Sequence, residues 1–324
     1  MFRHGTVWHS GGITGSGRRR ARHAPYKDTA NVMPRLPGPG PSLLGFVALA
    51  CALASLLFVL VELPAPTDAA WREGTVRVGY ALEPPYAYRT PEGIVTGEAP
   101  EVARAVLTRA GVTRIRWVLG DFNALIPDLL AGHIDMIAAG MFITPEREAR
   151  IAFSQPTSVV GQGMLVRRGN PRGLHDYAGL AGRTDVTVAV LDGAVEHRQL
   201  LLLGTPPDRL LMVSDAHAGM DAVRKGRVDG LALSGPTVVL LARQHPDELE
   251  AAQPFTQPLI EGKPATGLCA FGFRKGDTTL AAKVNEQLHS FIGTPQHLEL
   301  VRPFGFDEHA LPPWAIRDGR NPGD

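Results

Sequence analysis

Apolar positions follow two different spacings in the first half of the chain. VRVGYAL (76–82), IRWVLG (115–120) and IDMIAAG (134–140) are short apolar runs, typical of strands that are covered on both faces. Between these runs, apolar residues recur every three to four positions, which predicts two helices that end at Gly111 and Gly132. This alternation of strands and helices predicts an α/β fold with parallel strands.

One helix–strand pattern occurs twice. AGHIDMIAAG (131–140) aligns with KGRVDGLALSG (225–235), because in each a helix ends at glycine, two residues follow, and an aspartate precedes an apolar strand. The repeat predicts two similar α/β lobes. Asp135 and Asp229 are each either a candidate catalytic acid or a residue that caps the turn before its strand.

Three further stretches organise the lobes. VTVAVLDGAVE (186–196) predicts a strand that runs into a glycine turn and a helix, which opens the second lobe. GQGMLVRRG (161–169) and GLCAFGFRKG (267–276) are similar strands that end in basic residues and glycine, and they suit two connections between lobes. The predicted boundaries are 75–163 and 268–310 for lobe 1, 164–267 for lobe 2, and 311–324 for a tail.

The segment Leu43–Val61 is apolar for nineteen residues. This is close to the ~20 that span a bilayer and longer than the ~7–15 of a signal-peptide core. Upstream basic residues would stay in the cytoplasm, which sends the rest of the chain outside. A cleaved signal and an uncleaved anchor both remain open. Residues 1–42 are predicted to be a basic, disordered lead, with either Met1 or Met33 as the true start.

Composition excludes several classes of protein. With 44% hydrophobic and 20% charged residues the chain is globular. Residues 1–42 have a net charge of +6, which leaves −5 for the remainder of a chain whose total is +1. A mildly acidic folded part disfavours a nucleic-acid partner. Cys51 and Cys269 are too few for a disulfide framework or a cysteine metal cluster, and the eleven histidines show no paired ligand spacing. We expect no metal and no cofactor.

A conspicuous cation follows the third apolar run, within GMFITPER (140–147). Thr144 and Pro145 form a good helix start, which places Arg147 in the first turn. A cation there is disfavoured by several tenths of a kcal/mol, so an anion bound beside it would explain the residue. The guanidinium fork fits a carboxylate. The alternative is a surface arginine paired with Glu146 or Glu148.

Aromatic and acidic residues follow the predicted strands. Glu83 and Tyr86 lie in EPPYAY, directly after the first strand, and Phe122 and Phe142 follow the second and third. In an open α/β sheet, ligands bind outside the carboxyl ends of strands, so these side chains should converge. A carboxylate with aromatic faces suits a cation. With Arg147 they predict one site for a zwitterion, although Phe122 is equally consistent with plain core.

At this point the motifs resemble a known family. Residues 75 to about 312 are similar to extracellular solute-binding proteins of the amino-acid-binding family (family 3) of ABC importers, and most of all to its ectoine- and hydroxyectoine-binding members. The similarity rests on VRVGYALEPPYAY, TGEAPE, AAGMFITPER, RRGNPRGLHDY, QPFTQPLIEGKP and FIGTPQHLELVRPFGF. It implies a periplasmic-binding-protein-like fold (type II), with two α/β lobes, two hinge strands and a cleft between the lobes.

The resemblance also implies roles for individual residues. Arg147 would clamp the ligand carboxylate and Glu83 would meet a cationic amidine. An aromatic cage would surround the cation, and small residues would line the rest of the site. The cage residues are Tyr86, Phe122 and Phe142, and the lining residues are Gly140, Ala194, Val195 and Ser234.

Two positions depart from the amino-acid binders of this family. Ser234 stands where they usually have an aspartate for the ligand ammonium, which favours ectoine. Val195 stands where the family tends to have Ser or Thr, although the backbone N–H groups of Ala194 and Val195 could still face a carboxylate.

The resemblance therefore implies a monomeric, extracytoplasmic binding protein, not an enzyme, that captures a small zwitterion by lobe closure and delivers it to an ABC permease. Three alternatives remain. They are a binder of polar or basic amino acids, a dehydratase on the same scaffold with Glu83 or Asp135 as general acid, and a sensor tethered by residues 43–61.

Overall fold

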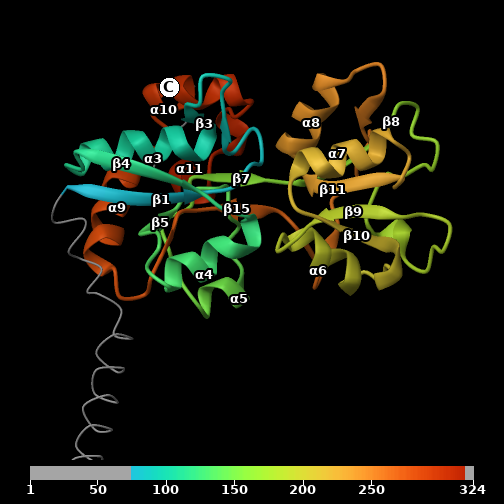
Figure 1. Cartoon of the computed structure of the whole chain (residues 1–324), viewed down its shortest axis with the longest axis horizontal. Helices are drawn as coiled ribbons and strands as arrows, with labels where there is room; N and C mark the ends of the chain where they lie inside the picture. The colour runs from blue at the N-terminus through green and yellow to red at the C-terminus, as the bar shows by residue number, and fades with distance from the viewer. Residues whose placement is uncertain (1–73, 318–324) are drawn as a thin grey trace, which may run out of the picture. The chain divides into compact units, whose positions relative to one another are not determined.

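The computed structural model describes residues 74–317 of the chain. These residues form two lobes, each built on its own five-stranded sheet (Figure 1). The predicted lead and the apolar segment 43–61 lie outside the described residues. None of the helices within 74–317 combines the length and the apolar character that a membrane crossing requires.

The first predicted strand, β1, is the second strand of the sheet in lobe 1. β1 pairs in parallel with β4 and β5, and β16 pairs antiparallel with β5 and β6. The strand order is β4 (Arg114–Leu119), β1 (Thr75–Tyr80), β5 (Met136–Ile137), β16 (Gly272–Phe273) and β6 (Ala152–Phe153).

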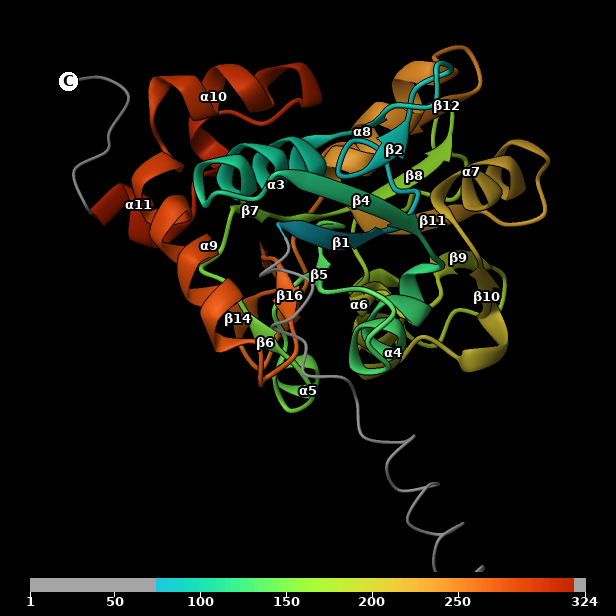
Figure 2. The same ribbon diagram turned by 60° about the vertical axis from the view of Figure 1, so that its left-hand side comes forward.

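Helices cover both faces of this sheet. On one side α3 contacts two helices from the C-terminal end of the chain, and α4 lies on the other side (Figures 1 and 2). The helices of lobe 1 are α3 (Glu98–Arg109), α4 (Leu125–Leu130), α5 (Pro145–Glu148), α9 (Thr278–Phe291), α10 (Pro295–Val301) and α11 (Pro313–Arg317).

Lobe 2 repeats the same strand order and directions. Its strand β9 pairs in parallel with β10 and β11, and β8 pairs antiparallel with β11 and β12. The order is β10 (Leu210–Val213), β9 (Val188–Leu191), β11 (Gly230–Ser234), β8 (Gln162–Arg167) and β12 (Leu249–Ala251). Its helices are α6 (Val195–Leu202), α7 (Ala216–Arg224) and α8 (Gly235–Gln244).

The repeat predicted from the sequence is confirmed by this topology. Its two aspartates also make equivalent contacts. Asp135 accepts a hydrogen bond from the backbone N–H of Arg77 (3.0 Å), and Asp229 accepts one from the backbone N–H of Thr187 (3.0 Å). Each aspartate therefore ties the start of its strand to the start of the neighbouring strand.

The two lobes are joined by a two-stranded antiparallel ribbon, β7 (Ser158–Val160) and β15 (Gly267–Cys269). The sequence placed the outward connection in residues 161–169. That placement is wrong, because residues 162–167 form β8 inside the sheet of lobe 2, and the preceding residues 158–160 make the connection.

The residues predicted as a tail are also partly incorporated into lobe 1. Leu311 and Ala315 are buried, and the indole Nε1 of Trp314 donates a hydrogen bond to the backbone oxygen of Pro156 (3.0 Å). The apolar side chains of LPPWAI explain this packing. The prediction of a tail followed instead from the prolines and from the polar residues at the end of the sequence. Residues 318–324 lie outside the described residues.

The remaining short elements belong to loops. They are β2 (Tyr88–Arg89), β3 (Val95–Thr96), β13 (Leu259–Ile260), β14 (Lys263–Pro264) and the 3-10 turns η1 (Phe122–Ala124), η2 (Ala178–Leu180), η3 (Pro207–Arg209), η4 (Arg302–Phe304) and η5 (Glu308–Ala310).

Candidate functional site

A small cavity lies where the carboxyl ends of strands from both lobes face each other. It measures about 20 Å³ and contains seven of the nine residues that the sequence singled out. That volume accommodates a water molecule and is far below the ~300 Å³ of ordinary ligand pockets. A ligand therefore needs the lobes to separate before it can enter. The lining residues are Glu83, Tyr86, Gly140, Phe142, Arg147, Val195, Glu196 and Ser234.

Arg147 links the two lobes. Thr144 caps α5 by accepting a hydrogen bond from the backbone N–H of Arg147 (3.3 Å), as the sequence predicts. The Arg147 guanidinium donates from Nη1 to the backbone oxygen of Phe142 in lobe 1 (2.7 Å) and from Nη2 to that of Gly193 in lobe 2 (2.9 Å). Each of these nitrogens carries a second N–H, so the fork retains donors for a carboxylate.

Glu83 is connected to lobe 2 by two hydroxyl groups. Ser234 Oγ donates to Thr237 Oγ1 (3.2 Å), and Thr237 Oγ1 donates to Glu83 Oε1 (3.1 Å). All three side chains are buried. Burial raises the pKa of Glu83 to about 7, although the Thr237 hydrogen bond and the Arg147 charge oppose the rise. The sequence did not identify Thr237, because its position opposite Glu83 depends on how the lobes meet.

The three predicted aromatic residues do not form one cage. Tyr86 and Phe142 line the cavity, whereas Phe122 lies under Arg147, with its ring centroid 5.4 Å from the guanidinium carbon, and lines a neighbouring cavity instead. Tyr86 is held by Phe306, whose ring centroid is 5.5 Å away at an edge-on angle of 65°. In this arrangement Phe122 contacts the guanidinium of Arg147.

Two glycines permit close approaches at the site. Gly140 has a φ of +63°, and a Cβ there would overlap the ring of Tyr86. Gly193 has a φ of +78°, and a Cβ there would lie 2.9 Å from the Cβ of Asn123 in lobe 1. These glycines let an aromatic ring and a loop of the opposite lobe reach positions that a side chain would block.

Ala194 and Val195 start helix α6 at the edge of the cavity. Val195 lines the cavity, and Ala194 lines a larger groove beside it. The backbone N–H of Ala194 donates to the Leu191 oxygen (3.1 Å). In this arrangement the tight turn before the helix uses the N–H of Ala194, and the prediction that the N–H groups of Ala194 and Val195 face a ligand carboxylate stays a prediction.

Glu196 is a site residue that the sequence reasoning missed. It is buried, lines the cavity, and has its pKa raised to about 8 by burial and by the nearby charge of Glu83. Burial lowers the pKa of the Arg147 guanidinium, while Glu196 and Glu83 counteract that effect. Its position directly after a predicted strand was the available signal, since this is where ligand-binding side chains gather. The site therefore contains two carboxyl groups and one guanidinium.

Asp135 is remote from this chemistry. Its carboxylate is bound by Arg77 Nη2 and by Arg274 Nη2 (2.6 Å and 3.0 Å), and its pKa is lowered because these hydrogen bonds outweigh burial. Asp229 is likewise paired with Arg167 and Arg172 (3.3 Å and 3.0 Å). Both aspartates are structural, so Asp135 is not available as a general acid.

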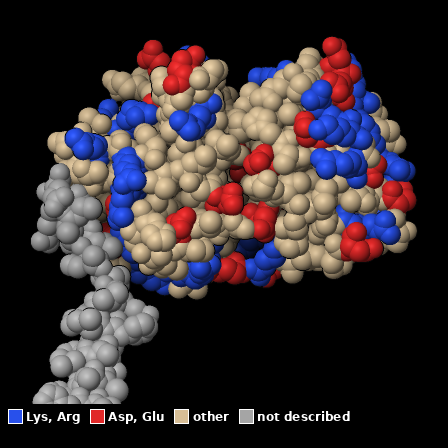
Figure 3. All heavy atoms as spheres, viewed as in Figure 1, with Lys and Arg blue, Asp and Glu red and all other residues tan. Residues whose placement is uncertain are grey.

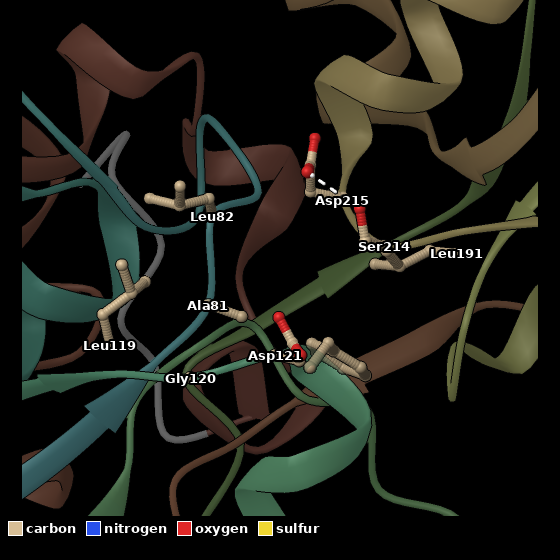
Figure 4. Close-up of a pocket in the computed structure, with 9 residues that line it drawn as sticks. Ala81, Leu82, Leu119, Gly120, Asp121, Leu191, Ser214 and Asp215 are labelled. Carbon is tan, nitrogen blue, oxygen red and sulfur yellow. Dashed lines mark hydrogen bonds between the residues drawn. The ribbon is translucent and has the colours of Figure 1, made fainter.

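A second cavity of about 300 Å³ lies on one flank of the site (Figure 4). Asp121 enters it from lobe 1, and Ser214 and Asp215 face it from lobe 2. Asp215 already accepts hydrogen bonds from the backbone N–H of Ala218 (2.8 Å) and from Ser214 Oγ (3.2 Å), as the cap of α7. Figure 3 shows further acidic side chains where the lobes meet. The cleft region is thus mildly acidic.

Comparison with known proteins places this geometry in context. The sequence profile of the bacterial extracellular solute-binding proteins, family 3, matches residues 76–305. A probable amino-acid ABC transporter periplasmic-binding protein of Sinorhizobium fredii is 37% identical over 235 residues, which cover 72% of this chain and 77% of that protein.

Two further similarities concern proteins whose ligands are named. The L-arginine-binding protein of Pseudomonas aeruginosa is 29% identical over 254 residues, or 76% of this chain and 94% of that protein. The crystal structure of EhuB in complex with hydroxyectoine superposes with a TM-score of 0.67 at 30% identity, covering 74% of this chain and 92% of that chain.

Proposed function

The chain belongs to the bacterial extracellular solute-binding proteins of family 3, and from this premise we propose that it captures ectoine or hydroxyectoine in the cavity between its lobes. Membership in the family makes it the substrate-binding component of an ABC importer for amino acids or related solutes, located outside the cytoplasm. The choice of ligand within that range is the proposal.

One observation supports a zwitterionic ligand above all others. Arg147 and Glu83 line the same small cavity, with Tyr86 and Phe142 beside them. The guanidinium would bind the ligand carboxylate, and Glu83 would bind the delocalised cation against the aromatic rings. Ser234 supports a ring amidinium over an α-ammonium, because a hydroxyl replaces the aspartate that would pair with the ammonium.

Capture would proceed through lobe closure about the β7–β15 ribbon. The ligand would first contact lobe 1, and closure would bring Val195, Glu196 and Ser234 over it. Closure is favoured only by contacts that exist in the closed state. The closed form would then dock on the permease and release its ligand. We propose that the protein acts as a monomer without turnover, and that residues 43–61 export it as a signal or retain it as an anchor.

Calorimetry with a panel of ligands tests the specificity. We expect ectoine and hydroxyectoine to bind with micromolar or tighter affinity, and proline, betaine, arginine and glutamine to bind at least tenfold more weakly. Tighter binding of proline or glutamine than of ectoine would contradict the proposal.

Substitution of Arg147 tests the predicted anion site. Arg147→Ala should weaken ectoine binding by about 10–100-fold, since a hydrogen bond to a charged group contributes ~1.5–3 kcal/mol. The ligand-induced rise in melting temperature should be lost with it. Arg150→Ala is the matched control, because Arg150 is exposed just after the same short helix. An unchanged thermal shift in Arg147→Ala rejects the assigned role.

A basic amino acid is the second candidate, and Glu196 is the observation that favours it. Two buried carboxyl groups in one cavity exceed what a zwitterion of one positive charge requires. A ligand with two cationic groups, such as arginine, would pair with both. Binding of arginine that is lost in Glu196→Gln, with ectoine binding retained, would identify this alternative.

A further inference from the structure

A groove of about 430 Å³ adjoins the small cavity and shares three of its residues, Phe142, Arg147 and Val195. It extends between α5 of lobe 1, α6 of lobe 2 and the loop before β15. The groove has the size of an ordinary ligand pocket, whereas the cavity has room for only a water molecule until the lobes separate. Arg147, the residue proposed to bind the ligand carboxylate, lines both spaces.

The walls of this groove are mainly apolar. Leu202, in the last turn of α6, is 60% exposed and lines the groove. At the rim, Glu146 and Arg198 form an ion pair across the lobes, and the exposed Glu261 adds one acidic side chain. The other apolar walls are Ile143, Pro145, Val195, Ile260 and Ala265.

We propose that this groove is a second subsite, which receives an uncharged apolar arm attached beside the carboxylate of the ligand. The inference rests on the proposed function, because it requires Arg147 to bind that carboxylate. An arm is favoured over a separate ligand because three residues line both the groove and the cavity. An uncharged arm is favoured because the walls of the groove are mainly apolar, and the opposite charges of Glu146 and Arg198 are paired with each other.

The predicted ligand class follows from this geometry. A compact zwitterionic head would occupy the cavity, and side chains of increasing apolar length would gain contact area in the groove. Alanine, leucine and phenylalanine share one head, whose carboxylate would bind Arg147 and whose α-ammonium would bind Glu83, and they differ in the length of the arm, so they are suitable probes. Ectoine, which lacks such an arm, serves as the probe for the head alone.

Calorimetry on the full chain with these four probes is the first measurement. We expect leucine or phenylalanine to bind about tenfold or more tightly than alanine. Equal affinity for all three amino acids, affinity that falls with arm length, or failure of all three to bind while ectoine binds would overturn the inference and leave the proposed function intact. Failure of ectoine and of every amino acid to bind would instead reject the proposed function.

Two variants then locate the arm. Thr266→Trp places a large ring in the groove from an exposed position, and Leu202→Asn removes its apolar wall. In each variant, leucine and phenylalanine should no longer bind more tightly than alanine. The affinity for ectoine should stay within about twofold of its value in the unsubstituted protein. Leu201→Asn is the control, because Leu201 is 38% exposed on the same helix but does not line the groove. An equal loss for ectoine and phenylalanine in Thr266→Trp, or an equal effect of the two leucine variants, would contradict the subsite.

Discussion

At the scale of single residues, the site is defined by an imbalance of charge. Glu83 and Glu196 share a cavity with one guanidinium, and burial raises the pKa of these carboxyl groups to about 7 and about 8. Both values lie above the ~4.3 of an exposed glutamate. The free energy of folding and the free energy of binding should therefore both depend on protonation near neutral pH.

This dependence has a definite sign. A carboxyl whose pKa is raised by folding contributes stability that is fully present below its unfolded pKa and is lost as pH rises through the folded value. The melting temperature of the ligand-free protein should consequently fall by on the order of 5 °C as the pH rises from about 5 to about 9. A cationic ligand requires the ionised carboxylates, so its affinity should rise over the same range. Scanning calorimetry and titration across this range measure both effects.

Glu196→Gln should flatten both pH profiles, because it removes the group with the higher pKa. Glu248→Gln is the control. The pKa of exposed Glu248 is lowered by its hydrogen bond with Arg224, so its contribution disappears only in acid. A pH profile that Glu196→Gln leaves unchanged would exclude Glu196 as its source.

At the scale of elements, the C-terminal motif supports the first loop of the chain. Phe306 packs edge-on against Tyr86 at 5.5 Å, and Phe304 packs against Tyr88 at 6.4 Å. FIGTP…PFGF and EPPYAY are more than two hundred positions apart in the sequence, and both are among the motifs that resemble the family. The structure connects them physically, because one motif fixes the ring that the other contributes to the site.

Substitution of Phe306 should therefore affect binding as well as folding. Phe306→Leu should lower stability by about 1 kcal/mol, as expected of a buried swap of similar volume. It should also weaken ligand binding by roughly 3–10-fold, because an aromatic contact contributes ~0.5–1.5 kcal/mol and Tyr86 loses its support. Melting and titration experiments measure the two effects.

The neighbouring phenylalanine provides the comparison. Phe304→Leu alters the contact with Tyr88, which does not line the cavity, so ligand affinity should stay unchanged. If both variants weakened binding equally, the loss would reflect general destabilisation of the loop and not the position of Tyr86.

How far the sequence predicts these features depends on their distance along the chain. Local patterns were sufficient for the α/β class, for the repeat, and for the capped turn that carries Arg147. Convergence of Glu83, Tyr86 and Phe142 followed from the rule on strand ends. Thr237 and the bond from Arg147 to Gly193 could not be predicted, because they depend on the packing of one lobe on the other. Phe122 is buried in the core beneath Arg147, which agrees with the core alternative that the sequence left open.

At the scale of the whole molecule, a few polar contacts hold the lobes together across the cleft. They include Arg147 to Gly193, Thr237 to Glu83, Asn123 to Asp192, and the ion pair of Glu146 with Arg198. The side chains of that ion pair are 55% and 59% exposed. An exposed pair contributes at most ~1 kcal/mol and is screened by salt.

Reversal of one charge in this pair should shift the lobes toward the open arrangement. Arg198→Glu places a like charge beside Glu146, so ligand should dissociate up to about fivefold faster, and the difference should shrink in high salt. The double variant Glu146→Arg with Arg198→Glu should restore the original rate. Stopped-flow dissociation at low and high salt measures this. Identical rates in the single and double variants would show that the pair does not stabilise closure.

The attachment of the C-terminal helix has a practical consequence of its own. Trp314 donates its hydrogen bond to Pro156, two residues before β7 begins, and stacks on His289 of α9 with ring centroids 5.7 Å apart. Its indole thus rests on the segment that leads directly into the pivot. A rotation of the lobes that displaces this segment would alter the surroundings of the ring, so we expect the fluorescence of Trp314 to report ligand capture without an added dye.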